Sequence, residues 1–355
     1  MLLDRLKRHW IRVALGLSVM VLFLLHVGGF VQMGFVDRLE YFAYDARLLF
    51  HLEKQPDDRI VIIDIDERSL KEEGRWPWGR DKIARLIKAV FDDYDAGLLG
   101  FDVVFAEPDD SSGLGVLEGL AENELADNSA YKSVLDTLRP SLNRDKVLAE
   151  TMVNYPVVLG YYFSNTTKEQ ILKIGKLPQP VFTDQHFAGR KIPFMKANGF
   201  GANLDALQDA ALGAGHFNPD VDVDGFVRRV PMLYEYEGAF YESLSLSMAR
   251  LALREESVSA GFPEESKAGG TYQGVEWLQV GERRIPVDER VRALVPYRGP
   301  QGSFPYVSAT DVLSGKADKK VFERRIVLVG TSAAGLQDLR STPVQSVYPG
   351  VEVHA

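Results

Sequence analysis

The segment from residue 59 to residue 108 constrains the fold most, because its pattern is that of a strand, a helix and a second strand. Residues 60–65 form a short apolar run rich in β-branched side chains, long enough for a buried strand and too short for a helix. Residues 80–91 then place apolar side chains at helical spacing, and residues 96–105 form a second apolar run. This order predicts a βαβ unit, in which the two strands are parallel and the connection between them is right-handed.

The patterns in the rest of the chain predict an α/β fold around this unit. Further strands are predicted at residues 156–163, 226–236, 275–297 and 325–329, and further helices at residues 37–50, 146–153, 241–253 and 309–314. Turns separate the short strands of residues 275–297, which are antiparallel in character. Residues 109–145 are rich in polar side chains and glycine, and they predict an exposed, partly helical insertion. We therefore expect a mixed, largely parallel sheet flanked by helices, with antiparallel additions.

An apolar run near the N-terminus predicts a transmembrane helix at residues 13–36. About 23 consecutive residues carry no formal charge, which at roughly 1.5 Å per residue is enough to cross a hydrocarbon core about 30 Å thick. Basic side chains precede the run, so residues 1–12 are predicted to stay in the cytoplasm and residues 37–355 to lie outside it. The alternative is a cleaved signal peptide, whose apolar region is normally only about 7–15 residues long.

Composition excludes several classes of function. The 41 Lys and Arg residues against 50 Asp and Glu give a net charge of -9, which is unfavourable for binding nucleic acid. The absence of Cys excludes disulfides, thiolate metal sites and cysteine nucleophiles. The six His residues are scattered without the spacing of a zinc site.

Acidic residues in or just after the two strands of the βαβ unit are the first candidates for a binding site. The carboxyl edge of an open parallel sheet is where such sites are usually built. Two Trp residues immediately before the helix could form a rigid aromatic wall beside this edge. The candidate ligand-binding residues are Asp64, Asp66, Trp76, Trp78, Arg80, Asp102 and Glu107. The alternative is structural, with the carboxylates in turns and helix caps and the Trp residues in a packed loop.

The pair Asp64 and Asp66 also suggests a phosphatase. Enzymes of the haloacid-dehalogenase type place a nucleophilic and an acidic Asp two residues apart after a strand, with a magnesium ion between carboxylates. Arg68 stands where such enzymes have a small hydroxylic residue, and their later motifs are not found. We therefore predict no catalytic residue, and we keep an anchored periplasmic phosphohydrolase using this pair with magnesium as the alternative function.

Residues 219–229 contain a second acidic cluster. Asp220, Asp222 and Asp224, followed by Gly225, match the first half of a calcium-binding loop, in which alternate carboxylates face one ion. The twelfth position should be a bidentate Glu and is Pro231, which excludes an EF-hand. A weaker calcium or magnesium site and a tight Asp-Gly turn remain as the two interpretations.

Several blocks along the chain, taken in order, resemble one family. They include IVIIDIDERSL, GRWPWGRDKIARLI, GFDVVFAEPD, GHFNPDVDVDGFVRRVPML, YRGPQGSFPYVSATDVL and GTSAAGLQDLRSTPVQSVYPGVEVHA. These resemble the type-two CHASE domains, and the resemblance covers residues 36–355. It implies an α/β sensory domain outside the bacterial inner membrane, held by an N-terminal helix. In such receptors further membrane helices and a cytoplasmic effector follow, commonly a class III adenylate or guanylate cyclase or a protein kinase.

The resemblance leads to a specific expectation about function. We expect the input region of an adenylate cyclase that makes cAMP, with the catalytic domain beyond residue 355 and an unknown periplasmic ligand or protein as the signal. Class III cyclases assemble their active sites between two catalytic domains, which implies a homodimer. Small residues suit close packing of the anchor helices, namely Gly16, Ser18, Gly28, Gly29 and Gly34. An apolar stripe on residues 37–50 could extend the contact.

Overall fold

The computed structural model describes residues 2–28, 30–31, 33–52, 56–166, 171–263, 273–336 and 338–355, with side chains from residue 9 onward. The chain divides into two compact units, Met1–His51 and Leu52–Ala355, and each is described by itself.

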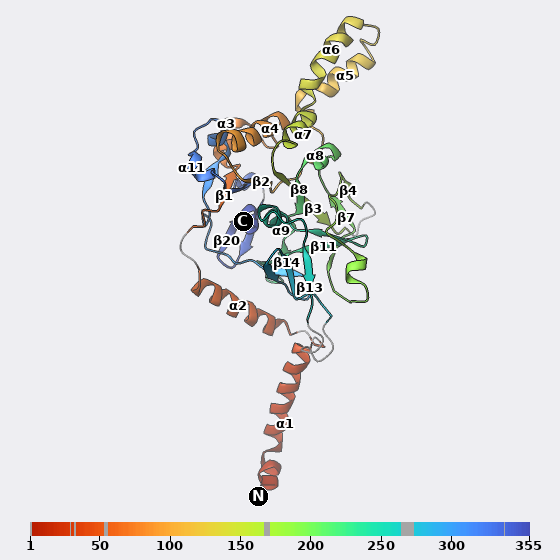
Figure 1. The fold of residues 1–355 in the computed structure, drawn as a ribbon. Coiled ribbons are helices and arrows are strands. Elements are labelled where there is room, and N and C mark those ends of the chain that lie inside the picture. The colour runs from red at the N-terminus through yellow and green to blue at the C-terminus, as the bar shows by residue number, and fades with distance from the viewer. Residues whose placement is uncertain are drawn as a thin grey trace. The chain divides into compact units, whose positions relative to one another are not determined.

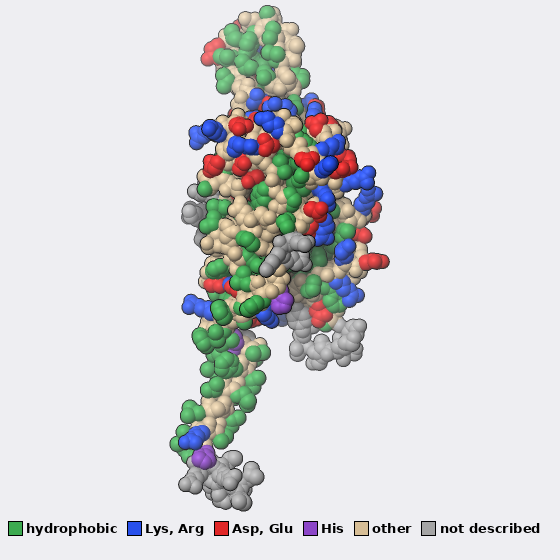
Figure 2. Space-filling view, turned by 90° about the vertical axis from the view of Figure 1, so that its left-hand side faces the viewer, with side chains coloured by type: hydrophobic (Ala, Val, Ile, Leu, Met, Phe, Trp, Pro, Cys, Tyr) green, Lys and Arg blue, Asp and Glu red, His purple; other side chains and the backbone are tan. Residues whose placement is uncertain are grey.

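The N-terminal unit contains two helices, α1 (Leu2–Val27) and α2 (Gly34–Phe50). Within α1, the segment His9–Val27 is long and apolar enough to cross a membrane, and hydrophobic side chains cover its surface (Figure 2). The predicted span of residues 13–36 therefore contains the end of one helix and the start of another. Gly28 follows α1, and glycine disfavours helix continuation because it loses the most backbone entropy.

The second unit is built on an eight-stranded sheet with the order β17-β1-β18-β2-β3-β7-β4, in which β8 also pairs with β3. The strands are β1 (Ile60–Asp64), β2 (Leu98–Phe101), β3 (Val157–Ser164), β4 (Lys173–Ile174), β7 (Gly199–Gly201), β8 (Gly213–His216), β17 (Tyr306–Ser308) and β18 (Ile326–Gly330). Every pairing is parallel except that of β3 with β7. The expected mixed, largely parallel sheet is confirmed.

The predicted βαβ unit is present, with β18 inserted between its two strands. Between β1 and β2 the chain forms α3 (Glu67–Glu73), which was not predicted, and α4 (Arg80–Lys88), which a π-helical turn at Ala89–Asp93 extends. Helix α4 buries Ile83, Leu86 and Ile87 against the sheet.

Helices cover this face of the sheet and form the larger core. In Figure 1, α3, α4, α7 and α8 lie along one side of the strands. Besides α3 and α4, this layer contains α7 (Arg144–Met152), α8 (Asp205–Ala210), α10 (Ala309–Leu313) and α11 (Lys319–Phe322). Alternate residues such as Val61 and Ile63 point into this core, as the two-residue period of a strand requires.

The opposite face of the sheet has its own smaller core. Ile62, Leu98 and Leu328 pack there against Met248 of α9 (Leu244–Ala252) and Val351 of α12 (Gly350–His354). These two helices thus occupy the face that α4 does not cover.

Short antiparallel strands complete the unit, as expected. They form the sheets β16-β10-β9, β5-β12-β11-β6 and β13-β14-β15 and the hairpin β19-β20. Their described pairings are antiparallel apart from that of β6 with β11. Their bounds are β5 (Phe182–Thr183), β6 (Met195–Lys196), β9 (Asp220–Val221), β10 (Val227–Pro231), β11 (Leu233–Tyr236), β12 (Ala239–Glu242), β13 (Ser259–Gly261), β14 (Trp277–Val280), β15 (Arg283–Pro286), β16 (Arg292–Leu294), β19 (Leu339–Thr342) and β20 (Gln345–Pro349).

The insertion of residues 109–145 is partly helical, as predicted. It contains α5 (Leu114–Glu122) and α6 (Ser129–Leu142), which contact each other. Most of its side chains are exposed or half-buried, and Ala121 and Leu135 are its buried ones.

Candidate ligand-binding site

Asp64, at the end of β1, is buried and bonded to the segment after β18. Its carboxylate accepts hydrogen bonds from the backbone N–H of Ser332, at 2.8 Å, and from the Ser332 hydroxyl. Burial raises the pKa of Asp64, and the two bonds from Ser332 partly oppose this. The Asp64 carboxylate therefore links the end of β1 to the segment that follows the neighbouring strand β18.

Asp66 has a different set of partners. It is the N-cap of α3, and its Oδ1 accepts from the Ser69 backbone N–H at 2.7 Å and from the Ser308 hydroxyl at 2.9 Å. Burial alone would raise the pKa of Asp66, but the bonds from Ser69 and Ser308 outweigh it and lower the pKa. Both carboxylates have the turn-and-cap role considered from the sequence. A ligand or magnesium role for the pair stays a prediction.

The two Trp residues belong to a packed loop before α4. Trp78 is 3% exposed, and its Nε1 donates to the backbone carbonyl of Gly74 at 2.9 Å. Trp76 is half-buried and meets Trp78 edge to face, with 5.5 Å between ring centroids. In these contacts the Trp side chains pack within the loop, as in the structural interpretation considered from the sequence.

Arg80 joins the loop after β2 to α7. Its guanidinium donates to the backbone carbonyl of Glu107 at 2.9 Å, lies 3.4 Å from Asp145 and stacks 4.7 Å above the ring of Phe105. Burial lowers the pKa of Arg80 despite the nearby carboxylates. The Glu107 side chain is exposed, so the contact with Arg80 is made by its backbone.

Each carboxylate of the second acidic cluster faces an arginine. Arg228 is 2% exposed and bonds Asp222 and Asp224 at 2.8–2.9 Å, and Arg292 bonds Asp220. Among the described residues no group of three acidic or His side chains is arranged to hold a metal ion. The Asp-Gly turn is present, since the Gly225 N–H donates to the Asp222 carbonyl at 2.8 Å. Calcium or magnesium binding here stays a prediction.

Asp102, after β2, lies in a buried cluster of ionisable groups that the sequence did not reveal. A small cavity of about 70 Å³ is lined by Asp102, Asp338, Arg340 and His354, among others. The His354 ring lies 3.9 Å from Asp102, and Arg340 pairs with Asp338 at 2.9 Å. Burial raises the pKa of Asp102 to about 7, and burial together with the charge of Asp102 raises that of Asp338 to about 6. Burial lowers the pKa of His354 to about 4.

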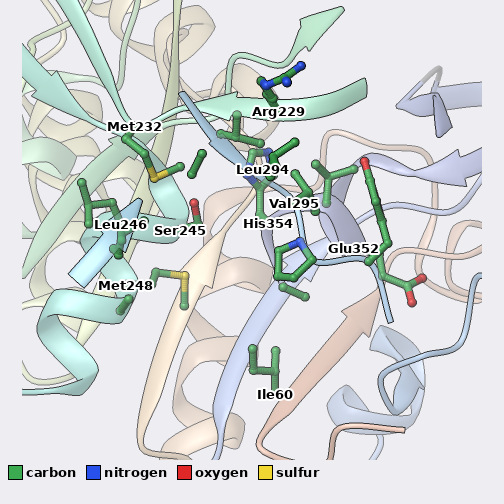
Figure 3. A pocket seen from close by; sticks show the side chains of 18 of the residues that line it. Ile60, Arg229, Met232, Ser245, Leu246, Met248, Leu294, Val295, Glu352 and His354 are labelled. Atoms are coloured by element: carbon green, nitrogen blue, oxygen red, sulfur yellow. The ribbon is translucent and has the colours of Figure 1, made fainter. Parts of the chain in front are cut away.

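A second, much larger cavity lies on the sheet face that carries α9 and α12. Its volume is about 860 Å³, within the usual range of about 300–1,000 Å³ for small-molecule sites. Its walls come from β1, β18, α9, α12 and the antiparallel strands β10, β15 and β16. Apolar side chains from these elements surround the space, including Ile60, Met232, Leu246, Met248, Leu294 and Val295 (Figure 3).

Helix α12 borders both cavities. Val353 and His354 line the large cavity and the small polar one, and Glu352 lines the large cavity alone. Glu352 is 2% exposed and accepts from the Ser303 N–H at 2.9 Å and the Tyr306 hydroxyl at 2.7 Å. A change in either cavity therefore acts on the same short helix.

Sequence reasoning missed this region because its walls come from segments far apart in the chain. The alternation of Val351 and Val353 with Glu352 and His354 gives no usable signal, because a two-residue period predicts a strand and these residues form the helix α12.

The described residues contain an α/β unit with a large apolar cavity and, earlier in the chain, a helix long and apolar enough to cross a membrane, a combination typical of the sensory domains of membrane receptors. Residues 17–355 match the family described as the CHASE2 domain, and the chain belongs to that family. CHASE2 is an extracellular sensory domain of receptors, so the resemblance seen in the sequence is confirmed. No curated protein and no solved structure matches the chain.

Proposed function

We propose that the chain is the sensing half of a receptor in the bacterial inner membrane and that its ligand binds in the large cavity. Helix α1 would anchor it, and residues 37–355 would lie in the periplasm. The observation that carries the proposal is the cavity of about 860 Å³ whose wall includes α12. If α12 can adopt two placements on the sheet, a ligand with higher affinity for one of them shifts the population toward that placement.

The effector proposed for this receptor is a class III adenylate cyclase that makes cAMP, encoded beyond residue 355. Its support is the family membership together with the resemblance described above. Communication across a membrane then requires that the ligand favour one of two arrangements of a homodimer. Helix α12 is a suitable starting point for this change because it contacts β18 and β20 as well as the ligand cavity.

The test fills the cavity covalently in the full chain, held in lipid nanodiscs. The natural sequence has no Cys, so Ser245→Cys provides one thiol in the cavity wall (Figure 3). Hexyl methanethiosulfonate then attaches an apolar chain at that thiol. We expect slower hydrogen exchange of the α12 amides after modification, because the filled cavity supports the helix.

Leu253→Cys is the matched control, since Leu253 follows α9 directly, is 41% exposed and does not line the cavity. The same hexyl group there should leave α12 unchanged. Equal effects from both positions, or no effect from either, would contradict the proposed role of the cavity.

A further inference from the structure

The charged side chains in the wall of the large cavity indicate which class of ligand it takes. Its described residues include more basic than acidic groups: Arg59, Arg229, Arg284, Arg292 and Arg298 against Asp57, Asp288 and Glu352. A wall with this excess favours an anion over a cation. Several of these groups pair with each other, so the excess alone does not locate the binding group.

Arg229 is the side chain best placed to bind such a group. It lies on β10 at one end of the side chains shown in Figure 3 and is 24% exposed. Its guanidinium is 3.5 Å from Asp288 and 3.9 Å from Asp222, and it makes no hydrogen bond to any described residue. A guanidinium has five N–H donors in a fixed fork that matches a carboxylate.

The neighbouring carboxylates are already used by other arginines. Asp288 accepts from Nε of Arg292 at 2.8 Å and from the backbone N–H groups of Arg290 and Arg292, and it pairs with Nη2 of Arg292 at 2.7 Å. Asp222 accepts from Arg228 at 2.9 Å. Both ion pairs of Arg229 are longer than a hydrogen bond, and its Nη2 belongs to neither, so this guanidinium can still donate to an acceptor that enters the cavity.

The apolar part of the wall indicates the rest of the ligand. Two Met residues, Met232 and Met248, face the space between Leu246, Leu294 and Ile60 (Figure 3). Methionine side chains are unbranched and adapt to the shape of what they contact. Such a wall suits a flexible hydrocarbon chain better than a rigid planar ring.

We infer that the ligand is a single-chain amphipathic carboxylic acid, whose carboxylate binds Arg229 and whose hydrocarbon chain fills the space beside Met232 and Met248. This inference rests on the proposed function of the cavity and adds the chemical class of the signal. Binding joins two contributions, the burial of an apolar chain and a charge-assisted hydrogen-bonded pair at one end.

The test compares three probes with the same hydrocarbon chain: decanoate, decanol and decylammonium. The readout is the reaction rate of Ser245→Cys with methyl methanethiosulfonate in the full chain in nanodiscs, because a ligand in the cavity shields this thiol. We expect decanoate to slow the reaction at a concentration roughly tenfold or more below that needed for decanol, the gain expected from a charge-assisted hydrogen bond. Decylammonium should protect least.

Variants of two arginines then locate the carboxylate. Arg229→Leu should remove the advantage of decanoate over decanol, and Arg229→Lys, which keeps the charge without the fork, should keep part of it. Arg284→Gln is the control, because the exposed Arg284 lines the same cavity but stacks on Trp277 at 4.6 Å. Unchanged hydrogen exchange of the central sheet checks that each variant is folded.

The outcomes separate the ligand class from the proposed function. Equal protection by decanol and decanoate, or stronger protection by decylammonium, overturns the carboxylic acid while leaving the cavity a binding site. Failure of all three probes to protect the thiol contradicts both the ligand class and the cavity as the sensing site.

Discussion

The buried carboxyl of Asp102 shows how strongly surroundings decide the behaviour of a single residue. The sequence pointed to Asp102 because it follows a strand at the carboxyl edge of the sheet, and the structure places it in an ionisable cluster at that edge. Its partners Asp338, Arg340 and His354 are more than 200 residues away. Spacing in the sequence could identify one member of this cluster and not the set, because the set depends on tertiary contacts.

The raised pKa of Asp102 predicts a particular pH dependence of stability. The pKa of this carboxyl is near its ordinary value of 3.8 in the unfolded chain and about 7 in the folded one. Between these values the folded state holds a proton that the unfolded state has lost, so the free energy of unfolding falls as pH rises from about 4 to about 7. Asp102→Asn cannot ionise. We expect it to gain stability relative to the natural protein by about 1 kcal/mol or more between pH 4.5 and 8.

Urea unfolding followed by tryptophan fluorescence measures the free energy of unfolding of Asp102→Asn and of the natural protein at each pH. Both proteins contain the buried His354, so its titration largely cancels in the difference between them. Asp338→Asn is the companion variant. The pKa of Asp338 is raised to about 6 by burial and by the charge of Asp102. The stability gained by Asp338→Asn relative to the natural protein should therefore have the same sign and level off near pH 6. If the curves for Asp102→Asn and the natural protein stay parallel from pH 4.5 to 8, Asp102 is ionised in the folded state throughout.

At the scale of elements, local pattern predicted the strands β1, β2, β3 and β18 of the central sheet, but it missed short elements such as β8, β17 and α3 and did not predict the order of the strands. The apolar run of residues 60–65 became β1, and the run of residues 325–329 became β18. Nothing local shows that β18 lies between β1 and β2, because strand order is set by how far-apart segments pack. The same holds for the large cavity, whose walls are formed by elements that lie far apart in the chain.

The packing of α12 on β18 depends on a glycine, which leads to a second prediction. A Cβ atom on Gly330 would lie 2.4 Å from Cβ of Val351, closer than side chains can pack. Gly330→Ala should therefore move α12 and destabilise the second unit by about 1–3 kcal/mol. The decrease would appear in urea unfolding and as faster hydrogen exchange of the α12 amides.

Gly115→Ala is the matched control for this glycine. Gly115 lies in α5 with open space where its Cβ would be, so alanine there should stabilise the helix by up to about 1 kcal/mol. Slower or unchanged exchange of α12 in Gly330→Ala would show that the helix is not seated against β18 through this contact.

At the scale of the whole molecule, the basic residues before the apolar helix predict its orientation. Residues 1–12 carry the positive flank, which is expected to stay in the cytoplasm, so the second unit should be on the other side of the membrane. A reporter that is active only outside the cytoplasm, inserted at Gly113 in the exposed insertion, should be active. Activity from a cytoplasmic reporter at the same position would reverse the proposed topology.

The homodimer is the last prediction, and it rests on the surface of α2. All side chains of this helix are described, and none is buried. Its stripe includes Leu39, Phe42 and Leu49, which are 50%, 72% and 51% exposed. An apolar stripe of this kind on a helix suits contact with the same helix of a second copy. The small residues of the anchor could add contact within the membrane, although Gly29 among them lies outside the described residues.

Disulfide scanning measures this contact without interference, because the natural chain contains no Cys. Single Cys substitutions from residue 37 to residue 50, oxidised in membranes, should cross-link with a helical period and most strongly along the stripe at positions 39, 42, 46 and 49. Substitutions on the opposite face of α2, such as Tyr44→Cys, are the internal control and should cross-link weakly. Uniformly weak cross-linking in membranes that contain folded protein would mean that α2 does not form the dimer contact. Cross-linking that changes along the stripe when decanoate is added would connect the cavity to the arrangement of the two copies, because only a ligand with different affinity for the two arrangements can shift their populations.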